Sequence, residues 1–124
     1  PQVDCPVEHR FSTGLYMRQV TIPAGTVVIG HEHKHPCWNI VLRGRAIIVM
    51  DGVRSEVVAP CVFISQAGVR KVGYHPEETV WITVHATTET DIAKLEEELI
   101  IKSRTWLDHA EIEALKEGGA PCHS

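Results

Sequence analysis

The feature that most constrains the fold is a series of short apolar segments between Leu15 and Ala86, each rich in Val, Ile and Thr. The segments read LYMRQVTI, TVVIGHEH, WNIVLRG, RAIIVM, VRSEVV, CVFIS, VRKVGY and VWITVHA. Turn residues separate them, and Asp51-Gly52 is the strongest hairpin signal because a type I′ turn needs positive φ at both central residues. An antiparallel sheet must cover one face with another sheet, so the pattern predicts an all-β sandwich or barrel.

Helical periodicity begins only after these segments. Apolar residues recur about every 3.6 residues in DIAKLEEELIIKS, and Thr90 or Asp91 can cap the first amides. A second short helix is expected from Asp108 to Gly118. We therefore expect residues 1–124 to form one domain, with a barrel over 15–86 and a helical extension over 90–118. The two ends carry no periodic signal, and the sequence supports no assignment there.

Composition narrows the choice of partners. The 124-residue chain has 16 acidic and 12 basic residues, a formal charge of −4, and no run rich in Lys and Arg. A nucleic-acid binder would show a basic surface, and no apolar stretch approaches the roughly 20 residues that cross a bilayer. We expect no nucleic acid and no membrane, but a small-molecule ligand or substrate. Four widely spaced cysteines and the absence of an apolar leader predict reduced thiols in the cytoplasm.

The stretch HEHKHPCWNI, residues 31–40, is the strongest candidate for a functional site. In a strand, alternate side chains share a face, so His31, His33 and His35 can point the same way. Neighbouring positions on that face have Cα atoms roughly 6.6 Å apart, whereas the outer two are roughly 13 Å apart, so only an adjacent pair reaches one ion easily. His35 could replace His31 if Pro36 shifts the register. The alternative interpretation is a polar strand face beside Cys37, a small buried thiol.

The spacing of these residues resembles the first motif of the cupin superfamily. Gly25, five residues, His31-Glu32-His33, then Cys37 and Gly44 fall in the same frame as that motif, and the resemblance covers roughly residues 15–86. It implies a small cupin-like β-barrel, an antiparallel jelly-roll sandwich with C-terminal helices. Two positions depart from the pattern, since Cys37 stands where the family has a glutamate ligand and Lys71 where it has a later histidine.

The resemblance also implies a metal site. His31 and His33 would be ligands, His85 on the last expected strand could supply a third nitrogen, and Cys37 could add a thiolate or leave a position for water. The cofactor expected is a divalent transition metal, with iron, zinc, copper, nickel and manganese all open. Lys71 and Tyr74 are expected at the substrate, where Lys71 would attract an anion. The alternative for both is ordinary: a solvated lysine and a packed tyrosine.

A cupin fold alone does not fix a reaction. Our first hypothesis is a metal-dependent enzyme acting on a small polar or anionic metabolite, of dioxygenase, isomerase or lyase type. The second is a non-catalytic cupin that serves as a ligand-binding, accessory or structural module, a kind of chain also found among tailed bacteriophages. Either is expected to form a homodimer, which would cover exposed strand edges. The histidines outside the candidate site are interpreted as solvated, and the tryptophans as packing residues: His9, His75, His109, His123, Trp38 and Trp81.

Overall fold

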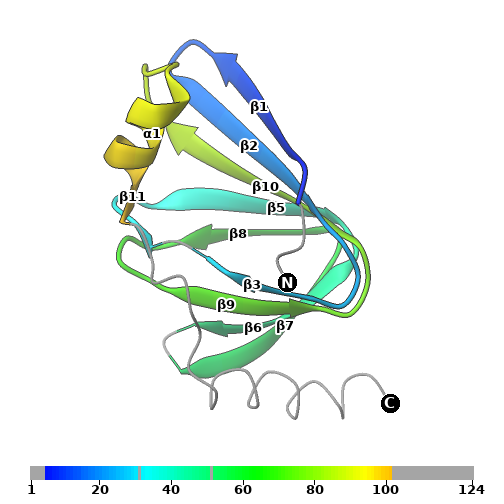
Figure 1. Cartoon of the computed structure of the whole chain (residues 1–124). Helices are drawn as coiled ribbons and strands as arrows, with labels where there is room; N and C mark the ends of the chain where they lie inside the picture. Colours follow the sequence, from blue (N-terminus) through cyan, green and yellow to red (C-terminus); the bar gives the residue numbers. More distant parts are fainter. Residues whose placement is uncertain (1–4, 31, 51, 102–124) are drawn as a thin grey trace.

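The protein folds into two antiparallel sheets that face each other (Figure 1). This computed structural model describes residues 5–30, 32–50 and 52–101. The five-stranded sheet has the order β1-β2-β10-β5-β8, and the four-stranded sheet has the order β3-β9-β6-β7. Its elements are β1 Val7–Ser12, β2 Leu15–Ile22, β3 Thr26–Ile29, β4 Glu32–His33, β5 Cys37–Arg43, β6 Arg45–Met50, β7 Val53–Val58, β8 Cys61–Ser65, β9 Lys71–His75, β10 Thr79–Ala86, α1 Ile92–Leu99 and β11 Ile100–Ile101.

The core lies between the two sheets and follows from the alternation of side chains along each strand. In β5, Cys37, Asn39 and Val41 are buried, whereas Trp38 between them and Leu42 after them are exposed. Inward residues from both sheets form one apolar cluster: Ile22, Val41, Ala46, Ile48, Val57 and Trp81. The predicted all-β sandwich is therefore confirmed, and each of the eight expected segments contributes a strand.

Three local features differ from expectation. The first is β1, which forms in an opening segment without periodic signal because it pairs along its whole length with β2. The expected strand over 26–33 is divided into β3 and β4 at Gly30, whose amide donates to the Lys71 carbonyl at 2.7 Å. The expected helix stops at Leu99, and the next two residues pair with β4 instead. The second expected helix, over 108–118, lies outside the described residues.

Two glycines with positive φ lie at connections between strands: Gly52 in the expected hairpin between β6 and β7, and Gly44 between β5 and β6. Met50 pairs with Val53, so β6 and β7 are joined by the two-residue connection that contains Gly52, at φ 78°. Gly44, at φ 84°, joins β5 to β6. A Cβ on Gly44 would lie 2.2 Å from the carbonyl oxygen of Glu78, so no side chain fits this close approach.

Helix α1 covers one end of the sandwich (Figure 1). Its buried residues Leu95 and Leu99 pack with Tyr16 of β2 in a second small apolar cluster. Asp91 caps the helix, since the Lys94 amide donates to its Oδ1 at 3.2 Å. The Lys34 amide donates to the Leu99 carbonyl at 2.7 Å, so the helix end is attached to the loop after β4. In the described part of the chain, no helix has the length and apolar character needed to cross a membrane.

The outer face of the five-stranded sheet carries an apolar patch. Trp38 lies opposite Ile64 on β8 and Val84 on β10, and Ile40 lies opposite Val62 on β8 and Ile82 on β10. Directly paired residues share a face of the sheet. The exposed fractions reach 51% for Trp38, 62% for Val62 and 44% for Ile64, so this face is apolar but open in the single chain.

Candidate functional site

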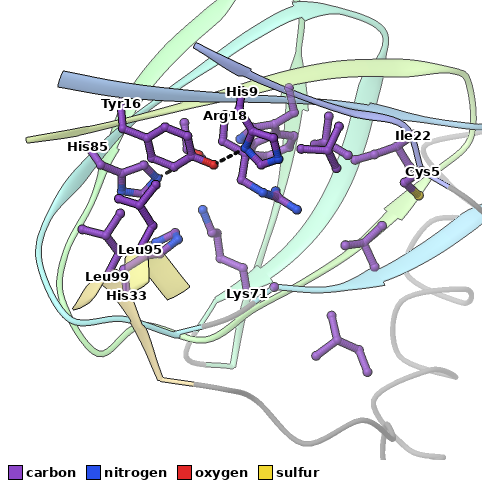
Figure 2. Close-up of a pocket in the computed structure, with 18 of the residues that line it drawn as sticks. Cys5, His9, Tyr16, Arg18, Ile22, His33, Lys71, His85, Leu95 and Leu99 are labelled. Atoms are coloured by element: carbon purple, nitrogen blue, oxygen red, sulfur yellow. Dashed lines mark hydrogen bonds between the residues drawn. The ribbon is translucent and has the colours of Figure 1, made fainter. Parts of the chain in front are cut away.

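A cavity of about 310 Å³ lies between the sheets and extends to α1 (Figure 2). Its apolar wall includes Val20, Ile22, Val28, Ile48 and Trp81. Its polar lining consists mainly of imidazoles and two cations: His9, His33, His75, His85, Arg18 and Lys71. Three residues of α1 also line it: Ile92, Leu95 and Leu99. The volume lies at the lower end of the range typical of small-molecule sites.

Three potential metal ligands meet beside this cavity. His33 comes from β4, Cys37 from β5 and His85 from β10, and their ligand atoms all lie within 4.8 Å of one another. The Sγ of Cys37 is 3.3 Å from Nδ1 of His33. Two donors on one tetrahedral zinc ion lie roughly 3.3 to 3.6 Å apart, given bonds of about 2.0 to 2.3 Å. Small rotations of these side chains therefore suffice for them to hold one ion, and the donor set fits a transition metal.

The protonation states of two of these ligands follow from burial. Burial, together with the smaller effect of the charges of Arg18 and Lys71, lowers the pKa of His85 to about 4. The imidazole is therefore neutral at pH 7, as a metal ligand must be. Burial raises the pKa of the Cys37 thiol, although the charge of Lys71 opposes that rise. Cys37 would therefore release a proton on binding a metal. Thr83 Oγ1 lies 3.0 Å from Nε2 of His85 and orients the ring.

Lys71 is held inside the barrel by a buried polar network around Asn39. Its Nζ donates to Asn39 Oδ1 and to Ser65 Oγ, each at 3.0 Å. The same Asn39 oxygen accepts from Trp81 Nε1 at 3.0 Å, and Asn39 Nδ2 donates to Ser65 Oγ at 2.7 Å. The ammonium also lies 5.5 and 5.7 Å from the ring centroids of Trp81 and Phe63, within the range of cation–π attraction. Burial lowers the pKa of Lys71, and the nearby Cys37 opposes this shift.

The structure thus brings together His33, Cys37 and His85, and it places His33, His85 and Lys71 on the wall of one cavity. His31, the other ligand that the resemblance implies, lies outside the described residues. His35, considered as its replacement, is exposed. Tyr74 does not line the cavity, because Lys71, Gly73 and His75 occupy the inward positions of β9 and Tyr74 falls on the alternate face.

Sequence reasoning missed other cavity residues. His75, interpreted as a solvated loop residue, is only 2% exposed and ends β9, with Nδ1 3.0 Å from Thr79 Oγ1. That interpretation was wrong, because strand β9 extends into the HPEE turn. His9, also interpreted as solvated, is exposed but lines the cavity, with Nδ1 2.7 Å from the Tyr16 hydroxyl. Arg18 was not considered; its side chain is exposed, but it alternates with Tyr16 and Val20 along β2 and lines the cavity with them.

Several solved structures with this architecture are described as cupins. A cupin superfamily protein from Desulfitobacterium hafniense is 14% identical, with a TM-score of 0.59 over 69% of this chain and 80% of that one. An RmlC-like cupin family protein with a double-stranded β-helix fold, from Methanocaldococcus jannaschii, is 13% identical, with a TM-score of 0.58 over 68% of this chain and 82% of that one. A Cupin 2 conserved barrel domain protein from Salinispora arenicola is 20% identical, with a TM-score of 0.57 over 76% and 82%.

Sequence comparison adds nothing to these structural matches, because neither a protein-family model nor a curated protein matches the chain. At such low identity, the structural likeness fixes the arrangement of the strands and leaves the chemistry to the residues of this chain. The expected motif frame, the two facing sheets and these neighbours agree on one architecture. The chain therefore has the cupin fold, a small double-stranded β-helix barrel.

Proposed function

We propose that the protein is a metal-dependent cupin enzyme that acts on a small anionic metabolite, with His33, Cys37 and His85 as metal ligands. The observation that carries the proposal is the convergence of three ligand atoms from three strands within 4.8 Å. Two imidazoles and a thiolate suit zinc, copper or iron, and nickel and manganese are further candidates. A bound ion would act as a Lewis acid or activate a bound water. Lys71, in the same cavity, would orient the negative group of the substrate.

The test is elemental analysis of protein purified without a His-tag or chelating resin. We expect stoichiometric metal in the wild type and in His35→Ala, which removes an exposed imidazole two residues from His33. We expect background metal in His33→Ala, because a site of three protein ligands loses a donor. Absence of metal from the wild type, even after soaking with each candidate ion and dialysis, would contradict the metal site. Equal metal content in His33→Ala and the wild type would do the same.

One observation favours a second function, non-catalytic ligand binding. Lys71 stands where the cupin resemblance expects a histidine ligand, and a buried ammonium at that place favours an anion over a further metal bond. In that case the protein would bind an anionic ligand without metal. The elemental analysis separates the two functions.

The partner and compartment that we propose follow from the surface and the thiols. A second copy of this chain would cover the apolar patch on the outer face of the five-stranded sheet, where Trp38 and Val62 are exposed. The three cysteines in the described residues, Cys5, Cys37 and Cys61, are free thiols. We therefore propose a homodimer in the reducing environment of the cytoplasm.

A further inference from the structure

Arg18 is a cation of the cavity that the metal site does not use. It lies on β2, between Tyr16 and Val20 on the face that lines the cavity. Figure 2 shows its side chain and that of Lys71 reaching toward one another from opposite walls. Arg18 is exposed and Lys71 is half-buried, and together they bring two positive charges to one cavity.

No acidic side chain balances this charge within the part of the cavity that the structure describes. Its lining residues include neither Asp nor Glu. Arg10, Arg43 and Arg45 each form an ion pair with a glutamate, whereas Arg18 has none among residues 5–30, 32–50 and 52–101. The partners of the Lys71 ammonium are the neutral oxygens of Asn39 and Ser65. Two cations in a largely apolar cavity create a positive potential that favours an anion.

The rest of the cavity lining limits the chemistry of the uncharged part of the ligand. In Figure 2, Ile22 and Cys5 lie on one side of the two cations, and His33, His85 and Leu99 lie on the other. Val20, Val28 and Ile48 pack with Ile22 in one apolar cluster and also line the cavity. A ligand that matches both the two cations and the apolar wall around Ile22 has a negative head group between the cations and a short apolar body.

We propose that Arg18 and Lys71 form the anion-binding subsite of this cavity, and that it holds the carboxylate or phosphate of a small organic acid with a short apolar body. The body lies against Val20, Ile22 and Val28. The proposal deepens the proposed function, since it names the substrate class of the same cavity. Arg18 is a binding residue in it, because its guanidinium donates charge-assisted hydrogen bonds to the anion.

The test is calorimetric titration of metal-free protein, treated with EDTA, so that binding does not depend on the metal site. The probes are 4-methylpentanoate, 3-methylbutyl phosphate and the uncharged 4-methylpentanamide. We expect at least one anion to bind and the amide to bind at least about tenfold more weakly, and added salt to reduce the difference. The preferred anion identifies the head group. Failure of both anions to bind, or equal affinity for the amide, would overturn the subsite.

Variants assign the charge to these residues. Arg18→Gln and Lys71→Gln should each weaken anion binding by about tenfold to a hundredfold, the loss expected for one charge-assisted contact. Arg43→Gln is the matched control, because it removes an exposed arginine that pairs with Glu78 and does not line the cavity. Circular dichroism confirms folding before titration. Binding by folded Arg18→Gln within twofold of the wild type would overturn the proposal.

The outcomes separate the subsite from the metal site. Arg18→Gln keeps all three metal ligands and should retain the metal content of the wild type. Metal-containing protein whose EDTA-treated form binds neither anion would overturn the subsite and leave the metal site supported. Protein without metal that binds anions through Arg18 would support the subsite and contradict the metal site.

Discussion

His75 should make the fold sensitive to mild acid. The imidazole is 2% exposed, and burial lowers its pKa from 6.5 to about 4. The unfolded chain therefore binds a proton at higher pH than the folded chain does. Stability rises with pH wherever the unfolded state binds more protons, so the contribution of His75 is fully present above pH 6.5 and is lost as the pH falls toward 4.

The size of this loss follows from the two pKa values. A shift from 6.5 to about 4 corresponds to about 3 kcal/mol in the free energy of unfolding, because one pKa unit is about 1.4 kcal/mol. About 2 kcal/mol of that is lost between about pH 7 and pH 5. Small domains are stable by only about 5 to 15 kcal/mol, so the change is a large fraction of the total. The pKa of His85 is also lowered to about 4, so a second, similar loss is expected in the same range.

Urea unfolding at pH 7, 6 and 5, followed by circular dichroism in EDTA, measures the effect. His75→Gln keeps a side chain able to bond with Thr79 but cannot titrate, so it should remove about half of the loss between pH 7 and pH 5. His35→Gln changes an exposed imidazole instead and controls for the substitution itself. The reasoning is refuted if His75→Gln and the wild type lose stability equally over this range.

Three further predictions concern packing, the buried network and assembly. Gly44→Ala should destabilise the fold by about 3 kcal/mol or more, because its Cβ would meet the Glu78 carbonyl, whereas Gly52→Ala, with nothing within 4 Å, should cost only about 1 kcal/mol in urea unfolding. Asn39→Leu should cost about 3 kcal/mol in the same assay, because two buried donors lose their acceptor, and a change below about 1 kcal/mol would contradict the network. Trp38→Glu should convert the proposed homodimer to monomer in sedimentation velocity, and an unchanged mass would show that this face is not the interface.

Much of the barrel could be predicted because strands leave a strong local signal. Alternation and turn residues located the eight segments, and the Asp51-Gly52 hairpin was confirmed by the pairing of Met50 with Val53. The signal failed where pairing, not local sequence, decides the conformation. Strand β1 is exposed at five of its six positions, so it has no apolar period and exists only through its bonds with β2. Helix α1 ends earlier than expected because Ile100 pairs with His33 as part of a short antiparallel strand pair.

The candidate site could be predicted only in part, for a related reason. His33 and Cys37 are close in sequence and lie in a recognisable frame, whereas the position of His85 depends on the order of strands β2, β10 and β5 in the sheet. Arg18 shows the opposite case, since its place on the same face as Tyr16 and Val20 was visible in the alternation of β2, although its side chain is exposed. An arginine was simply not considered as part of a cavity wall. His75 could not be placed without knowing that β9 extends through it.

Helix α1 is attached to the segment that carries His33, so the position of this helix at the cavity is linked to the position of the His33 imidazole. Lys34 N bonds to Leu99 O at 2.7 Å on one side, and Gly68 N bonds to His33 O at 2.9 Å on the other. Leu95 and Leu99 of α1 line the cavity. Because Leu99 is bonded to Lys34, a displacement of α1 would strain the segment that contains His33 and Lys34. A movement of α1 away from the cavity would therefore also disturb the segment that holds His33, and amide hydrogen exchange at Lys34 would report how often this hydrogen bond opens.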